Sequence, residues 1–368
     1  MTQVPFLDLK PQYQALEKSI NERIQVVLNH GQFILGPEVV ECENALANYI
    51  GSKNCLTAAS GTDALLMALM ALGIGPGDEV ITTSFSFFAT AEVISLVGAT
   101  PVFVDIDEES YNIDPVKIEA AITNKTKAIM PVSLYGQPAD FAEMAQVAEK
   151  HGLPIIEDAA QSFGAPYKGK KSCGITLIGA TSFFPAKPLG CYGDGGAVFT
   201  NDDRLNKIMG EIRVHGQESR YHHTRMGING RLDTLQCAIL IEKLKRYDWE
   251  VERRNDIANQ YTESLMSLGD ACIVPKVKSD RGSVWAQYTV RVKNREVFAA
   301  KMKEQGVPTS VHYPSPLHHQ PVYSSLRDLY HLPIAERVSK EVISLPIYPD
   351  MNAEQVEQVI RAARIAVQ

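Results

Sequence analysis

The hydrophobic positions of the chain follow two different spacings, and their alternation predicts the fold. Between Tyr13 and Val27 apolar residues recur every three to four positions, which predicts an amphipathic opening helix. Short apolar runs bounded by turn residues predict strands at residues 79–83, 101–105, 128–132, 154–158, 180–184 and 196–200. Helical spacing at residues 93–97, 116–122 and 141–150 falls between some of these strands. Such alternation is typical of an α/β domain with a mostly parallel sheet.

The pattern changes in the last third of the chain. Residues 232–268 have helical spacing, whereas proline and short strand-like runs become frequent after Gly269, with residues 285–292 as the clearest strand. Residues 353–366 predict a final helix. We therefore predict a large α/β domain at residues 1–250 and a smaller α+β domain at residues 251–368.

Composition excludes several classes of protein. The 368 residues are 45% hydrophobic and 21% charged, which excludes a disordered or collagen-like chain. The net charge of −7 disfavours binding to nucleic acid or to anionic membrane. The longest strongly apolar run, residues 64–75, is about half of the ~20 residues that span a bilayer. Residues 1–10 contain no apolar stretch, so we expect no signal peptide and a cytoplasmic protein.

Metal and disulfide signals are weak. The six cysteines show no C-x-x-C spacing, so we expect reduced thiols rather than disulfides or a zinc site. The adjacent pair His318 and His319 has no carboxylate at ligand spacing in the sequence. We therefore expect no metal.

Polar residues that directly follow strands are the first candidates for chemistry, because ligands of such sheets lie beyond the carboxyl ends of the strands. Asp158 closes one predicted strand, although an aspartate there is equally typical of a turn or a helix cap. Lys187 lies among apolar and small residues, with no acidic neighbour before Asp194. It is either a surface lysine or a partly desolvated amine of lowered pKa, as Schiff-base chemistry requires. A lysine about thirty residues after such an aspartate suits pyridoxal phosphate, whose aldehyde and ring nitrogen these two groups would hold.

The same cofactor needs a phosphate site and a surface for its ring. Ser60, Gly61 and Thr62 open a predicted helix, whose free amides suit a phosphate, although a plain helix cap has the same sequence. Phe87 follows a strand and is either a stacking residue or an ordinary core aromatic. Taken together, the four features indicate a pyridoxal phosphate site more strongly than any one of them.

Longer motifs then carry a family resemblance. They are Phe6-Leu7-Asp8-Leu9, Gly36-Pro37-Glu38, Ser60-Gly61-Thr62-Asp63-Ala64-Leu65, Glu157-Asp158-Ala159-Ala160-Gln161, Gly193-Asp194-Gly195-Gly196 and His312-Tyr313-Pro314. With these motifs the chain resembles the pyridoxal phosphate-dependent sugar-nucleotide aminotransferases of the DegT/DnrJ/EryC1/StrS family. The resemblance covers essentially the whole chain and implies the fold type I of pyridoxal phosphate-dependent transferases.

The resemblance also implies individual roles. Lys187 would hold the cofactor covalently, Asp158 would pair with its ring nitrogen and Gln161 with its ring hydroxyl. The remaining cofactor contacts would come from the phosphate-binding Ser60, Gly61, Thr62 and Ser182, the stacking Phe87, and Asn229. Because family members place the equivalent of Asn229 in the neighbouring subunit, the resemblance implies a homodimer with shared active sites. A branch of the family that replaces the lysine with histidine consists of dehydratases, and Lys187 argues against that branch.

A basic stretch bears on the substrate. Four arginines and three histidines lie between Arg213 and Arg231 against one acid, Glu218, which fits either an anionic ligand or a solvated loop paired with acids elsewhere. Residues 182–194 and 311–314 resemble a subgroup acting on a UDP-linked 3-oxo-glucuronate for bacterial surface polysaccharide such as O-antigen. That subgroup implies Arg231, His312 and Tyr313 as contacts to the sugar or its carboxylate. We take L-glutamate as the amino donor of the expected reaction, although the sequence alone does not determine the donor. The alternatives are an aminotransferase for a 4-keto UDP- or dTDP-sugar, and a catalytically idle pyridoxal phosphate-binding regulator, which the intact Lys-Asp-Gln set disfavours.

Overall fold

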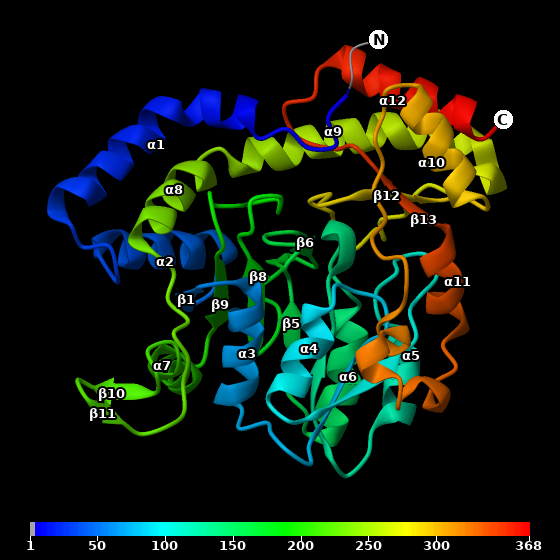
Figure 1. Cartoon of the computed structure of the whole chain (residues 1–368). Helices are drawn as coiled ribbons and strands as arrows, with labels where there is room; N and C mark the ends of the chain where they lie inside the picture. The colour runs from blue at the N-terminus through cyan, green and yellow to red at the C-terminus, as the bar shows by residue number, and fades with distance from the viewer. Residues whose placement is uncertain (1–3) are drawn as a thin grey trace.

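A central β-sheet organises the computed structural model, which describes residues 4–368 (Figure 1). Residues 1–3 lie outside the described residues. They belong to the predicted large domain and to the segment that we expect to contain no signal peptide. One group of strands has the order β1-β9-β8-β5, and a second has the order β3-β2-β4. Bridges from Ile129 to Ile155 and from Val132 to Asp158 join the two groups into one sheet. The strands are β1 (Asn54–Ala58), β2 (Glu79–Thr83), β3 (Thr100–Val104), β4 (Thr126–Met130), β5 (Ile156–Asp158), β8 (Ile178–Ser182) and β9 (Gly196–Thr200).

The directions of these strands confirm the mostly parallel sheet. Strand β2 pairs in parallel with β3 and β4, and β5 pairs in parallel with β8, whereas β9 runs antiparallel to both β1 and β8. Strands β2 and β9 have the predicted bounds, and β3, β4 and β8 begin one or two residues earlier than predicted. Strand β1 was not predicted.

Side-chain alternation explains why helices cover both faces of the sheet. In β2, Val80 packs in a core with α3, α4 and α7, while its neighbour Ile81 packs on the other side with α5 and α6. In β9, Val198 joins the first core, while Phe199 joins a core built with α2 and α8. These helices are α2 (Pro37–Ile50), α3 (Gly61–Ala71), α4 (Ala89–Leu96), α5 (Pro115–Ile118), α6 (Phe141–His151), α7 (Asp203–Ile212) and α8 (Thr234–Leu244). The opening helix, α1 (Lys10–His30), lies against α8.

A separate core forms around the last third of the chain. It contains α9 (Tyr247–Leu265), β12 (Tyr288–Arg291), α10 (Arg295–Glu304), β13 (Val342–Leu345) and α12 (Ala353–Ala366). Val4 packs in this core, and its amide donates to the Gly306 carbonyl at 3.1 Å, so both ends of the described chain lie together at the top of Figure 1. Helix α9 runs through residue 250 without a break. The division at that residue stays a prediction.

Three further segments complete the described fold. Residues 317–342, which include α11 (Pro333–Glu341), return to the α/β core and pack beside Phe85 and Phe103. A short hairpin, β10 (Gln217–Ser219) with β11 (His222–His223), projects from the lower left of Figure 1. A second small hairpin pairs β6 (Pro166–Tyr167) with β7 (Lys170–Lys171). Within residues 4–368, no helix combines the length and the hydrophobicity needed to cross a membrane.

Candidate active site

Lys187 lies in a compact loop directly after β8. The amide of Lys187 donates to the Phe184 carbonyl at 2.8 Å, and the amide of Cys191 donates to the Phe183 carbonyl at 2.8 Å. Gly190 closes this loop, because a Cβ there would lie 2.6 Å from the Phe184 carbonyl oxygen. The loop therefore holds the lysine at the carboxyl end of the sheet, where ligands of such folds bind.

Asp158 ends β5, the parallel neighbour of β8. Its carboxylate is buried and accepts hydrogen bonds from Thr90 Oγ1 at 2.8 Å and from the Ala160 amide at 3.1 Å. Burial raises the pKa of Asp158, while these hydrogen bonds and the charge of Lys187 oppose the rise. Desolvation lowers the pKa of Lys187, and Asp158 opposes that shift. The two predicted groups therefore interact across a partly dry site, as their proposed roles require.

The predicted phosphate site is built where α3 meets β8. Ser60 caps α3, and its Oγ accepts from the Asp63 amide at 3.0 Å, which leaves the first amides of the helix, at Gly61 and Thr62, for a ligand. A Cβ at Gly61 would lie only 2.7 Å from the Ser182 Cβ. The glycine therefore permits the contact that brings Ser182 beside the helix N-terminus.

Gln161 links the segment after β5 to Tyr135 and to Tyr313, which are distant from it in the sequence. Gln161 Oε1 accepts from the Tyr135 amide at 2.7 Å, and its Nε2 donates to the Tyr313 hydroxyl at 3.0 Å. Burial raises the pKa of Tyr313, so its hydroxyl stays protonated. The Tyr313 ring lies 6.2 Å from the ring of Phe87, which is 56% exposed. Phe87 thus offers a free ring face for stacking rather than serving as a core aromatic.

His312 is held as a neutral imidazole. Its Nδ1 lies 2.8 Å from Ser344 Oγ. Burial lowers the pKa of His312 to about 4, and the charge of Lys187 acts in the same direction. The Tyr135 hydroxyl donates to the His312 carbonyl oxygen. The neutral His312 imidazole can therefore donate or accept a hydrogen bond near Lys187 without carrying a charge.

The structure does not bring Asn229 and Arg231 into hydrogen-bond contact with the other predicted residues of this subunit. Asn229 is exposed, although its neighbour Gly230 accepts from the Ala59 amide at 2.9 Å, one residue before Ser60. Arg231 is half-buried, and its Nε is buried without a hydrogen-bond partner in the described chain. An unpartnered guanidinium nitrogen suits an anionic ligand, and the Gly230 contact brings the backbone before Arg231 close to the start of α3.

Other arginines of the basic stretch have internal partners. Arg213 pairs with Glu43, and Arg225 Nε lies 2.6 Å from Glu211 Oε2. The alternative of pairing with acids elsewhere therefore holds for these two.

Three contacts of the site were not predicted: Thr90 on Asp158, the Tyr135 amide on Gln161, and Ser344 on His312. Thr90 stands in the same stretch as Phe87, and its hydroxyl faces the strand-end aspartate because α4 packs beside the sheet. Ser344 comes from β13, more than 30 residues away in the sequence, so no local pattern indicates it.

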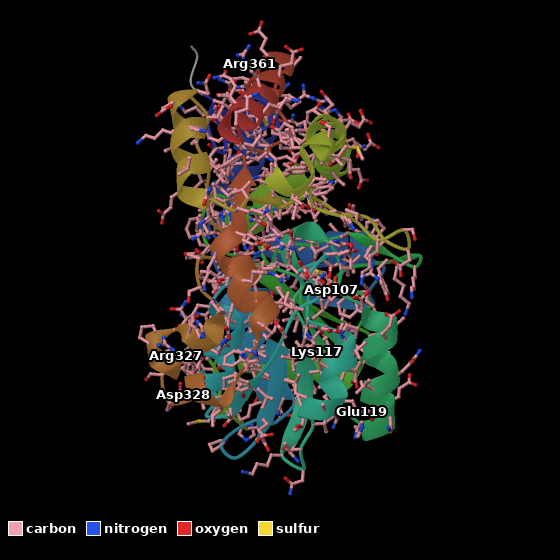
Figure 2. All side chains as sticks on the ribbon, turned by 90° about the vertical axis from the view of Figure 1, so that its right-hand side faces the viewer. Asp107, Lys117, Glu119, Arg327, Asp328 and Arg361 are labelled. Atoms are coloured by element: carbon pink, nitrogen blue, oxygen red, sulfur yellow. The ribbon has the colours of Figure 1, made fainter. Side chains whose placement is uncertain are left out.

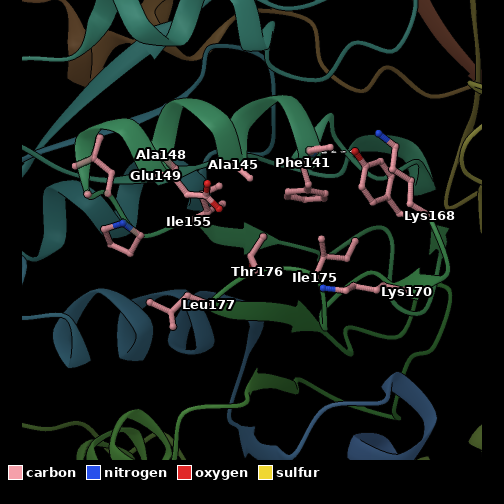
Figure 3. Close-up of a pocket in the computed structure, with 15 residues that line it drawn as sticks. Phe141, Ala145, Ala148, Glu149, Ile155, Lys168, Lys170, Ile175, Thr176 and Leu177 are labelled. Carbon is pink, nitrogen blue, oxygen red and sulfur yellow. Dashed lines mark hydrogen bonds between the residues drawn. The ribbon is translucent and has the colours of Figure 1, made fainter.

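A cavity of about 570 Å³ lies elsewhere in the molecule, between α6 and the segment before β8 (Figure 3). Ala145, Ala148 and Glu149 line it from α6, and Lys168 and Lys170 line its other end. Ile155 and Leu177, which also line it, precede β5 and β8, whereas Asp158 and Lys187 follow the opposite ends of these strands. This cavity is therefore not part of the candidate site.

Comparisons with known proteins agree with this geometry. The sequence profile of the DegT/DnrJ/EryC1/StrS aminotransferase family matches residues 14–364. The chain belongs to this family. It is 52% identical over 359 residues to the UDP-2-acetamido-2-deoxy-3-oxo-D-glucuronate aminotransferase of Pseudomonas aeruginosa, covering 98% of this chain and 99% of that protein. It is 47% identical to a pleiotropic regulatory protein of Geobacillus stearothermophilus, covering 97% of this chain and 96% of that protein.

Solved structures of family members have the same fold. DesV of Streptomyces venezuelae superposes with a TM-score of 0.98 at 40% identity, covering 100% of this chain and 99% of that one. NtdA of Bacillus subtilis, solved with bound cofactor PMP, has a TM-score of 0.93 at 31% identity, covering 100% of this chain and 86% of that one. The fold is therefore that of the type I pyridoxal phosphate-dependent transferases, and the chain is an aminotransferase.

The residues present fit pyridoxal phosphate, the cofactor of this family. The free helix amides at Gly61 and Thr62 suit its phosphate, and the exposed ring of Phe87 suits its ring. Asp158 keeps unused acceptor capacity beside its two hydrogen bonds, so it can accept from a protonated ring nitrogen. When bound, the cofactor supplies the electron sink that amino transfer needs.

Proposed function

We propose that this aminotransferase moves the amino group of L-glutamate to C3 of UDP-2-acetamido-2-deoxy-3-oxo-D-glucuronate. The observation that carries the proposal is the 52% identity, over nearly the full length of both chains, to the Pseudomonas enzyme of that name. The buried Asp158 opposite Lys187 supports catalysis rather than a purely regulatory role, although one relative is named as a regulator.

The side chains of the site divide the work of amino transfer. Lys187 Nζ, whose pKa is lowered by desolvation, would take the proton from Cα of glutamate as a base and, in the second half of the reaction, would deliver a proton to C3 of the sugar as an acid. Asp158 would keep the ring nitrogen of a bound cofactor protonated, because a buried carboxylate favours a cationic donor beside it. Gln161 holds the Tyr313 hydroxyl in place with its Nε2, and its Oε1 in turn accepts from the Tyr135 amide.

Three residues are proposed to select the uronate. The unpartnered Nε of Arg231 would receive the sugar carboxylate or the diphosphate, and the neutral His312 and Tyr313 would donate to sugar hydroxyls. If Arg231 binds the sugar carboxylate, a 4-keto sugar that lacks this group would leave the guanidinium without an anionic partner. If Arg231 binds the diphosphate, both kinds of sugar nucleotide would satisfy it.

The active unit is proposed to be a homodimer in which Asn229 completes the phosphate site of the partner subunit. The exposed position of Asn229 supports this arrangement. So do the exposed apolar side chains of Phe33, Ile34 and Leu35, which lie beside the same region through the bridge from Ile34 to Asp233. We further propose a cytoplasmic enzyme that supplies a sugar for surface polysaccharide such as O-antigen, without a nucleic-acid or membrane partner.

The mass of the product tests the proposed reaction. Purified holoenzyme is supplied with L-glutamate and either the 3-keto uronate or a 4-keto UDP- or dTDP-sugar, and each product is measured by mass spectrometry. We expect an amino sugar from the 3-keto uronate, no turnover with Lys187→Ala, and poor turnover of the 4-keto sugars. Preferred amination of a 4-keto sugar would overturn the substrate, and no amination of any acceptor would favour the regulator.

A further inference from the structure

A cluster of two histidines and a glutamate lies outside the amino-transfer site. His318 and His319 belong to a short 3₁₀ turn at Leu317–His319, and Glu336 stands in the first turn of α11. His318 is fully buried, and the other two side chains are partly exposed. One ligand atom from each of the three residues lies within 4.8 Å of those of the others. The sequence did not indicate this group, because Glu336 is distant along the chain and the fold brings it to the histidine pair.

The distances within this His-His-Glu cluster approach those of a zinc site. His318 Nε2 lies 3.3 Å from Glu336 Oε1, and His319 Nε2 lies 3.8 Å from the same oxygen. Ligands at ~2.0–2.1 Å in a tetrahedral zinc site are about 3.3–3.4 Å apart. Binding of one ion would require a rotation of the partly exposed His319 and Glu336 side chains, which would direct all three atoms at it.

The backbone around the cluster is fixed before any ion binds. The Leu317 amide donates to the Ser84 carbonyl at 2.7 Å, which ties the histidine turn to the end of β2. Arg327 Nη2 donates to the His319 carbonyl at 2.7 Å. The Leu332 amide donates to Glu336 Oε1 at 3.3 Å and orients that carboxylate. His318 Nδ1 is buried without a hydrogen-bond partner in the described residues, so packing rather than a second hydrogen bond sets the orientation of this ring.

We propose that His318, His319 and Glu336 bind one zinc ion, with water as the fourth ligand. Two imidazoles and a carboxylate form a ligand set that zinc accepts in proteins. The ion would close the segment between His319 and Glu336 onto α11. This segment carries the exposed Arg327 and Asp328, and in Figure 2 it lies at the edge of the molecule. The site would therefore stabilise the fold and take no part in amino transfer.

Zinc binding by untagged holoenzyme tests the proposal. The protein is stripped with a chelator, titrated with zinc chloride in competition with a chromophoric chelator, and its Tm is measured with and without zinc. The variants are His319→Ala and Glu336→Gln, both at partly exposed positions. His331→Ala is the matched control, because His331 is exposed in the same segment and lies outside the cluster.

We expect wild type and His331→Ala to bind one zinc per chain and to gain Tm on binding. The two cluster variants should bind zinc more weakly by more than the roughly 10–100-fold that loss of an outer-shell partner costs. Cobalt bound in place of zinc should give the intense visible bands of a tetrahedral site in wild type and in the control. Equal zinc affinity in wild type and Glu336→Gln, or an unchanged wild-type Tm with zinc, would overturn the proposal and indicate a hydrogen-bonded cluster.

Discussion

Arg231 is a candidate ligand contact because one of its guanidinium nitrogens, Nε, is buried without a hydrogen-bond partner in the described chain. The same holds for Nε of Arg213. Arg213 differs because another of its guanidinium nitrogens pairs with Glu43, whereas no acid of the described chain pairs with Arg231. A buried donor without a partner is costly, so a ligand that supplies the acceptor would explain why Arg231 is retained. The sequence indicated the stretch as a whole, but it could not separate the arginines that pair with acids, Arg213 and Arg225, from Arg231.

Arg231→Ala should impair use of the uronate acceptor by about 2–4 kcal/mol in transition-state terms, because a desolvated carboxylate loses its charged partner. The measurement is kcat/KM for the acceptor, with the glutamate half-reaction followed separately by single-turnover absorbance. That half-reaction should change much less. An equal loss with an acceptor that lacks the carboxylate would assign Arg231 to the diphosphate or to the fold instead.

His312 gives a prediction about stability and pH. Its pKa is lowered to about 4 in the folded chain by burial, from an ordinary value near 6.5. Between these two pH values the unfolded chain binds a proton that the folded chain does not, so this residue makes stability fall as the pH drops from about 6.5 towards 4. Urea unfolding at pH 7 and pH 5 should show a smaller loss of stability for His312→Gln than for wild type. His331→Gln, at an exposed position, serves as the control and should lose as much as wild type.

Secondary-structure elements were predicted well where their pattern is local. The final helix, Ala353–Ala366, has the predicted bounds because its apolar residues recur on one face and Asn352 with Gln355 caps its start. Strand β1 was missed because its place in the sheet depends on pairing with β9, which is about 140 residues away. For the same reason the local pattern indicated a phosphate site at residues 60–62, whereas the participation of Ser182 from β8 came only from the family resemblance.

The contact between α3 and β8 predicts the effect of Gly61→Ala. The added Cβ would lie 2.7 Å from the Ser182 Cβ and would force the helix start away from the strand. Overpacking of this kind costs about 1–3 kcal/mol, or roughly fivefold to over a hundredfold in an equilibrium. We expect weaker binding of pyridoxal phosphate, measured by fluorescence titration of the cofactor-free protein.

Gly210→Ala in α7 is the matched control, because the nearest atom to its added Cβ is Leu56 Cδ1 at an ordinary 3.8 Å. This variant should bind the cofactor as wild type does. Equal effects of the two substitutions would show that the close approach at Gly61 does not matter for the phosphate.

Across the whole molecule, the fold places nearly all predicted site residues around one end of the sheet and leaves Asn229 on the surface. The sequence could predict the α/β class because alternating strands and helices are a property of local patterns. It could not show which side of the molecule completes the site, since a contribution from a partner depends on a surface formed only after folding. The exposed apolar residues Phe33, Ile34 and Leu35 mark the surface that we propose for this contact.

Mixed dimers test whether two subunits share each active site. Asn229→Ala and Lys187→Ala should each be nearly inactive as pure dimers, because every site then carries one lesion. In a mixed dimer, a two-fold arrangement places both lesions in one site and leaves the other site intact. Subunit exchange followed by isolation of differently tagged mixed dimers should therefore recover up to about half of the wild-type activity per dimer. Sites contained within one subunit would leave both sites of the mixed dimer damaged, so no recovery, or an active monomer in ultracentrifugation, would refute the shared site.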